Sequence, residues 1–310
     1  MFRQTSPYTH RMATKALPAA AAAVAALVLA WPAALGAQAI QRAMYVSVVN
    51  QAGAPVPDLG PSDFIVREDN AQREVLRVVP AEDPMQIAIL IDTSQAARDD
   101  ISHMRTALPP FIAALTSGEG KNQVAIIAIG ERPTVFADYS TSPAALKKGV
   151  DRIWSLPDSG AYLLDAIVEA CQGFKKREAA RPVIVSITTE GPELSNLQYQ
   201  QVLEPLRASG AAYHAITLGR ASTSMSDEVR NRNVVLDEGP RTTGGSRGEL
   251  LTGMALEGKL RELANQLTHQ YKVTYARPQS LIPPERITVA ASKPGLTARG
   301  TAIKETQVRP

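Results

Sequence analysis

The sequence predicts an α/β protein with a doubly wound, mainly parallel sheet and a small flanking β domain built from its N- and C-terminal segments. Three observations support this fold class. Continuous apolar runs of strand length recur through the middle of the chain, as expected where both faces of a sheet are covered. Amphipathic helical stretches separate these runs, which is the pattern of a doubly wound fold. Both ends of the chain instead show short alternating segments that are typical of antiparallel strands.

Residues 1–39 have the character of a secretory signal peptide, with an uncleaved N-terminal anchor as the alternative. Three basic residues precede a long alanine-rich apolar run, and Ala37-Gln38-Ala39 ends it in an A-x-A pattern. Both alternatives place the body outside the cytoplasm, as a periplasmic or secreted protein, and a membrane association is expected only through this segment. Without these residues, 30 of the 33 basic residues remain against 30 acidic ones, so the body offers no electrostatic case for nucleic-acid binding.

The segments 43–82 and 277–310 are too short to bury separate cores. The first contains "MYVSVVN", "FIVRED" and "QREVLRVV", with turn residues between them. The second contains "ITVAAS" and "LTARGTAI" on either side of Lys293-Pro294-Gly295, which indicates a hairpin. We therefore expect the C-terminal hairpin and tail to pair with the N-terminal strands.

Residues 83–276 contain the predicted α/β domain. The strands are expected at "IAILID", "NQVAIIAIG", "RPVIVSIT" and "AAYHAITLG". One helical stripe runs from Ile101 to Leu115, and Pro109-Pro110 should kink or restart that helix. A second stripe consists of four leucines, from Leu256 to Leu267. The segment 222–247 contains no clear period and is predicted to be a long irregular loop. The single cysteine, Cys171, lies on an apolar helical stripe and is expected to be buried.

The order of several short strings resembles a von Willebrand factor type A domain, and the flanks resemble a bacterial family of exported VWFA-related proteins. The resemblance covers nearly all of residues 43–303. It depends on "FIVRED", "IDTSQA", "LLDAI", "TTEG", "TGGSRGELL" and "YKVTYARPQSLIPPERI". The resemblance implies a metal-ion-dependent adhesion site, with an Asp-x-Ser-x-Ser loop, a threonine from a second loop and a later aspartate. Such oxygen ligands suit Mg²⁺.

Mapped onto this chain, the implied site is degenerate. Asp92 and Ser94 match the first two loop positions, but Ala96 stands at the second serine position. Ala161 stands at the threonine position, and Glu190 stands at the late aspartate position. Two of five oxygen donors are therefore methyl groups, which cannot bind a cation. We expect no cofactor, with Mg²⁺ at Asp92, Ser94 and Glu190 as the alternative.

The expected function is recognition of another protein, without catalysis. In open α/β sheets, ligands bind beyond the carboxyl ends of the strands, where the strand order reverses. This rule and the resemblance indicate a partner-binding edge made of Asp92, Thr93, Ser94, Ser159, Thr189 and Glu190.

Two other functions fit parts of the sequence. Residues 244–248 match the G-x-S-x-G string of serine hydrolases, with His269 and either Glu257 or Glu262 as triad partners for Ser246. However, polar turn residues precede this string, whereas a nucleophile elbow follows an apolar strand. The other alternative is a scaffold subunit of the cell envelope, in which the sheet edge has no binding role.

Overall fold

The computed structural model describes residues 1–2, 39–118, 122–219, 226–279 and 282–304. The fold described below belongs to the unit that begins at residue 39. The predicted signal segment lies almost entirely outside the described residues. Among the described helices, none has both the length and the apolar character needed to cross a bilayer.

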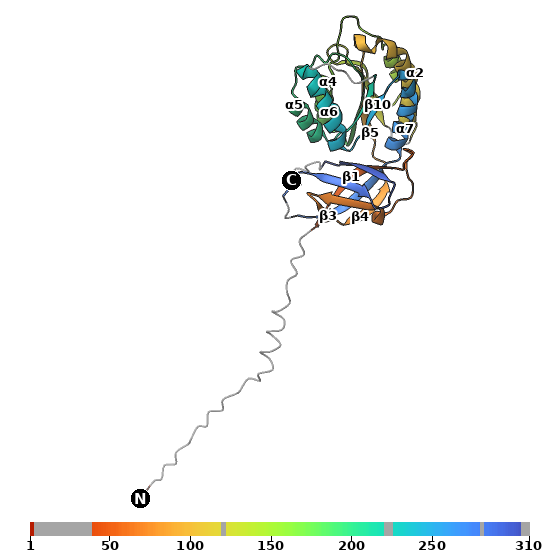
Figure 1. Cartoon of the computed structure of the whole chain (residues 1–310). Coiled ribbons are helices and arrows are strands. Elements are labelled where there is room, and N and C mark those ends of the chain that lie inside the picture. The colour runs from red at the N-terminus through yellow and green to blue at the C-terminus, as the bar shows by residue number, and fades with distance from the viewer. Residues whose placement is uncertain (3–38, 119–121, 220–225, 280–281, 305–310) are drawn as a thin grey trace. The chain divides into compact units, whose positions relative to one another are not determined.

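This unit contains a six-stranded sheet in the order β10-β9-β8-β5-β6-β7 (Figure 1). All neighbouring strands in it are parallel except β6 and β7. Every residue of β8 and β9 is buried, which explains why these strands are continuous apolar runs in the sequence. The strands are β5 (Met85–Ile91), β6 (Gln123–Ala128), β7 (Thr134–Ser140), β8 (Arg181–Thr189), β9 (Ala212–Leu218) and β10 (Arg247–Leu250).

Helices cover both faces of this sheet and enclose two hydrophobic cores (Figure 1). One core contains apolar residues of α2, α3 and α7, and the other contains those of α4, α5 and α6. The doubly wound α/β fold predicted from the sequence is therefore confirmed. The helices are α2 (Ile101–Thr116), α3 (Pro143–Val150), α4 (Leu163–Lys176), α5 (Tyr199–Ser209), α6 (Asp227–Thr243) and α7 (Leu256–Thr268), with short 3₁₀ helices at η1 (Pro61–Asp63), η2 (Gln95–Asp100) and η3 (Gly253–Ala255).

The N- and C-terminal segments form two antiparallel sheets, in the orders β13-β1-β11-β4 and β12-β2-β3. Their apolar side chains share a third core. The predicted flanking β region from both ends of the chain is therefore confirmed. β11 pairs with β1 and β4, so its residues lie outside the parallel sheet. The strands are β1 (Ala39–Val49), β2 (Phe64–Glu68), β3 (Ala71–Arg73), β4 (Val75–Pro80), β11 (Tyr271–Pro278), β12 (Ile287–Ala291) and β13 (Thr297–Ala302).

The prediction of a C-terminal hairpin is wrong. β12 pairs with β2, whereas β13 pairs with β1 in the other sheet. The turn at Lys293-Pro294-Gly295 thus connects two sheets instead of two paired strands. Both strands place apolar side chains in the core that they share with the N-terminal strands, and this packing decides between the pairings.

The predicted irregular loop at 222–247 is largely a helix. Residues 220–225 are outside the described part, but α6 begins at Asp227, immediately after the N-cap residue Ser226. The Ser226 side chain accepts a hydrogen bond from the backbone N–H of Val229, and Asp227 and Glu228 lie favourably in the first turn. Eleven of the 17 residues of α6 are polar or charged, which hides the helical period of its narrow apolar stripe in the sequence.

The helix α2 continues through Pro109 and Pro110, so the predicted restart of the helix is wrong. A proline inside a helix removes one backbone hydrogen bond and crowds the preceding turn. Here Leu108, Phe111 and Ile112 are all buried against the sheet and α7. Burial of this stripe outweighs the local cost of the prolines.

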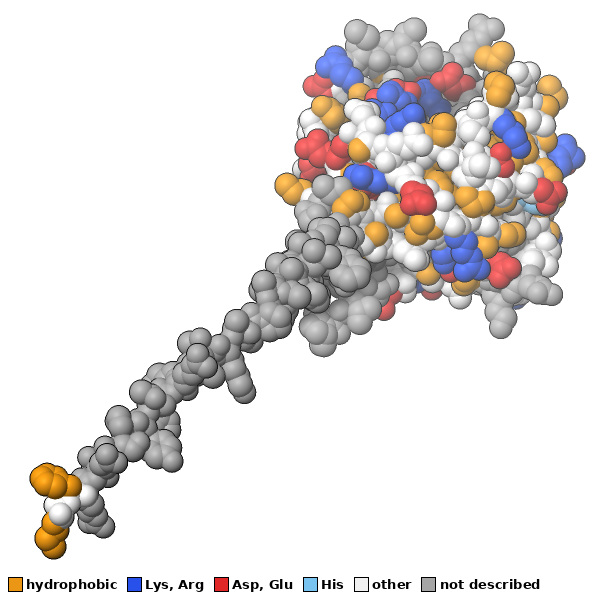
Figure 2. Space-filling view, turned by 90° about the horizontal axis from the view of Figure 1, so that it is seen from below, with side chains coloured by type: hydrophobic (Ala, Val, Ile, Leu, Met, Phe, Trp, Pro, Cys, Tyr) orange, Lys and Arg blue, Asp and Glu red, His pale blue; other side chains and the backbone are white. Residues whose placement is uncertain are grey.

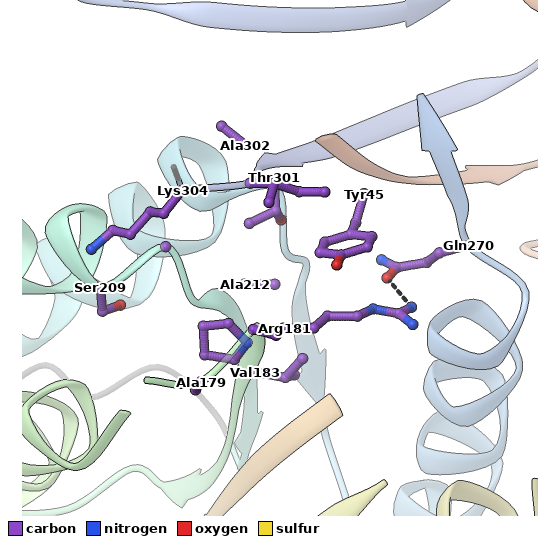
Figure 3. A pocket seen from close by; sticks show the side chains of 14 residues that line it. Tyr45, Ala179, Arg181, Val183, Ser209, Ala212, Gln270, Thr301, Ala302 and Lys304 are labelled. Atoms are coloured by element: carbon purple, nitrogen blue, oxygen red, sulfur yellow. Dashed lines mark hydrogen bonds between the residues drawn. The ribbon is translucent and has the colours of Figure 1, made fainter. Parts of the chain in front are cut away.

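The β region and the α/β domain meet at the buried side chain of Arg181 (Figure 3). Its guanidinium donates hydrogen bonds to Leu267 O at 2.9 Å and to Gln270 Oε1 at 2.6 Å. It also lies over the Tyr45 ring, 4.8 Å from the centroid. Burial lowers the Arg181 pKa to about 10, which leaves the group charged at neutral pH. Arg181 therefore connects β8, α7 and β1.

Basic and acidic side chains lie interspersed with apolar ones on the face seen from below (Figure 2). This mixture agrees with the balance of charge outside the N-terminal segment.

Candidate functional site

The candidate site lies beyond the carboxyl end of β5. This strand lies between β6 and β8. The connection after β5 leads to β6 on one side, whereas the connection after β8 leads to β9 on the other side. Such a reversal of strand order creates a crevice between the outgoing loops. Asp92 follows β5 directly, and Glu190 follows β8 directly. The fold thus brings these two predicted site residues to one edge.

Asp92 is fully buried, and both of its carboxylate oxygens accept hydrogen bonds from the protein. Oδ1 accepts from the Ser94 backbone N–H at 2.9 Å. Oδ2 accepts from the Thr189 backbone N–H at 2.9 Å and from the Thr189 hydroxyl at 2.7 Å, with the Thr188 hydroxyl at 3.3 Å. Asp92 therefore joins the loop after β5 to the end of β8.

The neighbouring hydroxyl side chains are also enclosed. Thr93 is 1% exposed, and its Oγ1 accepts a hydrogen bond from the Gly130 backbone N–H at 3.0 Å. Ser94 is equally buried, and its Oγ is without a hydrogen-bond partner among the described residues. The Ser159 hydroxyl donates to Leu156 O at 2.8 Å within its own loop. Four of the six predicted edge residues, Asp92, Thr93, Ser94 and Thr189, are thus buried and hold the loops together.

The two alanines of the degenerate motif lie at close contacts between loops. A Cβ built on Gly191 would come within 2.5 Å of the Ala96 Cβ. Ala161 is buried and forms a short bridge with the loop after β8, donating to Pro192 O at 2.9 Å and accepting from Leu194 N at 2.8 Å. At both positions, the alanine packs against the backbone of the loop after β8.

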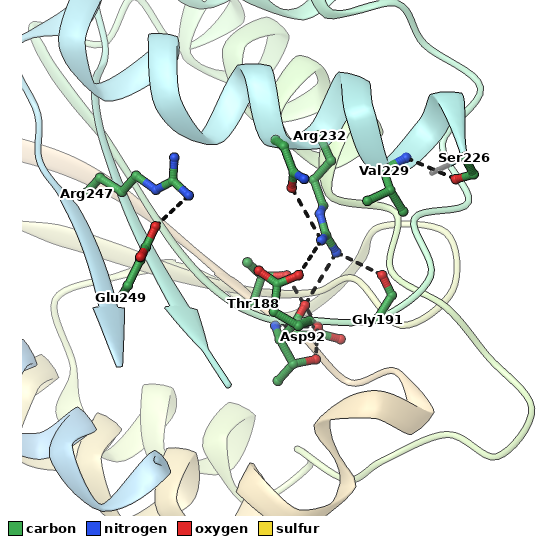
Figure 4. A network of polar contacts seen from close by, with 11 residues as sticks. Asp92, Thr188, Gly191, Ser226, Val229, Arg232, Arg247 and Glu249 are labelled. Carbon is green, nitrogen blue, oxygen red and sulfur yellow. Dashed lines mark hydrogen bonds and ion pairs between the residues drawn. The ribbon is translucent and has the colours of Figure 1, made fainter. Parts of the chain in front are cut away.

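Arg232 is the functional-site residue that the sequence analysis missed. It reaches down from α6, and its side chain is fully buried (Figure 4). Its guanidinium forms an ion pair with Glu190 Oε2 at 2.8 Å and donates to Gly191 O at 2.9 Å. The signal was an arginine on the apolar stripe of α6, between Val229 and Val235. That stripe was not recognised as helical.

These contacts do not fit a bound Mg²⁺ ion. The ion requires near-octahedral oxygen ligands. Both Asp92 oxygens already accept hydrogen bonds, and the Glu190 carboxylate is neutralised by Arg232. Ala96 and Ala161 supply no donor. The unpartnered Ser94 hydroxyl is a single neutral ligand, and one such group binds magnesium weakly.

Comparison with known proteins agrees with the α/β fold. Residues 86–232 match the family model described as von Willebrand factor type A domain. The chain contains a VWA domain. Residues 92–94 and 190 of the candidate site all lie within this match, as does Arg232 at its end. No curated protein sequence matches the chain at a significant level.

Solved structures similar to the chain come from several organisms. Proximal thread matrix protein 1 from the mussel byssus, in a form with a zinc-occupied MIDAS motif, shares 16% identity and a TM-score of 0.49, covering 68% of this chain and 50% of its own. A von Willebrand factor type A protein from Catenulispora acidiphila shares 12% identity and a TM-score of 0.47, covering 86% and 73%. The vWF domain of the type V pili tip protein Mfa5 from Porphyromonas gingivalis shares 10% identity and a TM-score of 0.46, covering 60% of this chain and 95% of its own. The chain thus spans half the length of the mussel protein.

Exposed apolar side chains lie along the carboxyl edge of the six-stranded sheet. Between residues 83 and 268, the described part of the chain exposes five large hydrophobic side chains by at least 40%. All five belong to this edge. One starts β7, whose first residues pair with the end of β6, and the others lie in the loops that close over the carboxyl ends of β5, β8 and β10. They are Val135, Trp154, Leu194, Leu251 and Met254.

Glu193 is a second buried acid at this edge that the sequence analysis missed. Its Oε1 accepts from the Ser195 backbone N–H at 3.1 Å, and its Oε2 has no hydrogen-bond partner among the described residues. Burial raises the pKa of this carboxyl to about 7. No sequence signal identified it, because the loop after β8 has no period that predicts burial.

We expect Glu193 to make stability depend on pH. Between pH 4.5 and about 7, the native state holds a proton that the unfolded chain has lost, so the free energy of unfolding falls as the pH rises through this window. Glu193→Gln keeps the hydrogen-bond acceptor without the charge. The variant should equal the parent near pH 4 and exceed it above pH 7, by about 3 kcal/mol at most.

Urea unfolding at a series of pH values measures this difference. The parent's curve also contains other titrating groups, so the difference between parent and variant isolates Glu193. The exposed Glu204 provides a matched control, Glu204→Gln. Parent and Glu193→Gln curves that stay parallel from pH 4 to pH 8 would contradict the prediction.

Ser246, the nucleophile of the hydrolase alternative, contacts a histidine other than the predicted His269. Its Oγ lies 2.9 Å from His214 Nδ1, whereas His269 Nδ1 hydrogen-bonds Asn265 O on its own helix. His214 Nε2 is buried without a hydrogen-bond partner among the described residues, and burial lowers the His214 pKa to about 3. Ser246 also precedes β10, and so lies at the amino end of the sheet.

Proposed function

We propose that this chain is an exported, non-catalytic protein whose VWA domain binds another polypeptide through the carboxyl edge of the six-stranded sheet, without a metal ion. The observation that supports this most directly is that all five exposed large hydrophobic side chains of the described α/β domain lie along that edge. Tryptophan and methionine, two of these residue types, are enriched in protein interfaces. Export is inferred from the N-terminal segment.

The buried polar network gives a physical reason for binding without metal. In a metal-dependent site, the cation attracts a carboxylate from the partner. Here the site's own acids are satisfied internally, Asp92 by hydrogen bonds and Glu190 by Arg232. The network therefore keeps the loops in place, and recognition depends on the exposed side chains above it.

Site-specific photocrosslinking tests this proposal in the native host compartment. A photoreactive amino acid is placed in turn at Trp154, Leu194 and Leu251, and at the control position Leu76, which is 41% exposed on β4. We expect one discrete polypeptide adduct from the edge positions and none from Leu76. Equal adducts from Leu76, or none from any edge position, would refute the proposed surface.

A chelator separates metal-free recognition from metal-dependent recognition in the same experiment. The adducts should persist in EDTA, and titration calorimetry of the purified protein with Mg²⁺ should give no binding heat. Loss of the adducts in EDTA, with recovery in Mg²⁺, would show that a cation is required.

The contact between Ser246 and His214 keeps a serine hydrolase as the second candidate function. A neutral histidine beside a serine is one part of a nucleophilic pair, but no carboxylate among the described residues hydrogen-bonds His214 Nε2. We therefore expect a fluorophosphonate probe not to label the protein. Labelling that disappears in Ser246→Ala would favour the hydrolase over the binding protein.

A further inference from the structure

A cleft of about 170 Å³ lies beside the Asp92 loop at the carboxyl edge. Its lining includes Thr93, whose backbone O accepts a hydrogen bond from Leu156 N at 2.8 Å. Its walls include the aromatic rings of Phe136 and Trp154, with centroids 6.2 Å apart. Trp154 is 53% exposed. The cleft therefore presents an aromatic wall to a partner, beside polar and charged lining residues.

Two exposed arginines, Arg132 and Arg152, line the same cleft. The Arg152 guanidinium lies over the Phe136 ring at 4.6 Å and donates to Phe136 O at 3.1 Å. Neither arginine forms a salt bridge with a carboxylate of the described residues, although Arg132 acts on Glu169 electrostatically. Glu131 is the one acidic residue that lines the cleft. An arginine held against a ring is prepared to bind a carboxylate without losing much side-chain entropy.

We propose that this cleft binds a partner segment in which an aromatic side chain lies next to an aspartate or glutamate. The inference rests on the proposed function and specifies the chemistry of the partner. An apolar cavity of about 150 Å³ in another protein holds a benzene molecule, so the cleft has room for one aromatic ring. The neighbouring carboxylate pairs with Arg132 and Arg152 at the rim. Charge-assisted hydrogen bonds of this kind are about twice as strong as neutral ones.

In this proposal, arginine side chains bind the partner carboxylate that a cation would bind in a metal-dependent site. The buried network under the loop has no cation to offer a partner, since Arg232 is fully buried and paired with Glu190. Arg132 and Arg152 are instead exposed, and they line the cleft together with Thr93 of the Asp92 loop.

Tryptophan fluorescence provides a direct test, because the chain has two tryptophans, Trp31 and Trp154. In the Trp31→Phe protein, emission reports the cleft alone. The probes are three end-capped octapeptides of glycine and serine with a central Phe-Glu, Phe-Gln or Ala-Glu pair. We expect a saturable change with the Phe-Glu peptide and binding that is about tenfold weaker for both controls.

The double variant Arg132→Gln/Arg152→Gln should remove the preference for Phe-Glu over Phe-Gln. Both arginines are exposed, so the variant should keep its thermal unfolding midpoint. Equal binding of Phe-Glu and Phe-Gln, or no saturable change with Phe-Glu, would overturn the inference. Photocrosslinking from Leu251 separates this outcome from failure of the proposed function. Adducts that persist would leave edge recognition intact and remove only the cleft.

Discussion

Arg232→Met is expected to destabilise the protein by about 3–5 kcal/mol, since breaking a buried ion pair leaves an uncompensated charge. The substitution removes the partner of Glu190 and the donor to Gly191 O, where the Arg232 side chain is fully buried and that of Glu190 is 13% exposed. Methionine fills a similar volume, so the lost polar contacts dominate the effect. Denaturant unfolding at pH 7 measures the change.

Arg230→Met is the matched control, because Arg230 lies two residues away on the same helix. Its ion pair with Asp227 is exposed, with side-chain exposures of 67% and 78%. Exposed pairs contribute little, so this variant should stay close to the parent. Adding Glu190→Gln to Arg232→Met should restore part of the loss. A stability of Arg232→Met equal to that of Arg230→Met would show that the buried pair does not hold the site together.

Gly245→Ala is expected to cost about 3 kcal/mol or more, because overpacking against backbone forces a shift of the chain. A Cβ on Gly245 would come within 1.8 Å of Tyr213 O. The flanking backbone is held by hydrogen bonds from Gly245 N to Pro240 O and from Ala215 N to Ser246 O. Thermal unfolding measures the loss.

Gly258→Ala provides the opposite expectation in the same experiment. Gly258 lies within α7, and a Cβ there would meet nothing within 4 Å. This substitution should stabilise the protein by about 0.5–1 kcal/mol. A tolerated Gly245→Ala would mean that the close approach of residue 245 to the Tyr213 backbone is not required by packing.

The parts of the fold that were predictable are those in which burial determines composition. β8 and β9 are buried on both faces, so their residues had to be apolar throughout and the parallel sheet was evident. The position of Asp92 at the carboxyl edge of the sheet was predictable because it follows such a strand directly. The pairing of both chain ends followed from segments too short to form cores alone.

The errors arose where the deciding contact is distant in sequence. The helix α6 is mostly polar, and it was taken for a loop because its few apolar residues pack against elements that only the fold brings near. The two last strands looked like a hairpin because they are adjacent in sequence, yet each pairs with an N-terminal strand. Local pattern says little about which of several compatible partners a strand takes.

The candidate site shows the same division. Which oxygen donors are missing is legible in the sequence, since Ala96 and Ala161 cannot bind a cation. The ion pair between Glu190 and Arg232 cannot be read from the sequence, because 42 residues separate the two side chains. Their contact depends on how α6 packs at the edge of the sheet. The Glu193 pKa of about 7 is likewise a consequence of burial in a loop.

The strand pattern, the doubly wound class and the alanines at positions 96 and 161 can be read from the sequence, because each depends on the residue type at one position or on a local period. The burial of Asp92 and its neighbours, the pairing of Glu190 with Arg232 and the exposure of large apolar side chains along the sheet edge are visible only in the folded chain. These properties depend on which surfaces remain in contact with water after the chain has packed, and a local stretch of sequence does not contain that information.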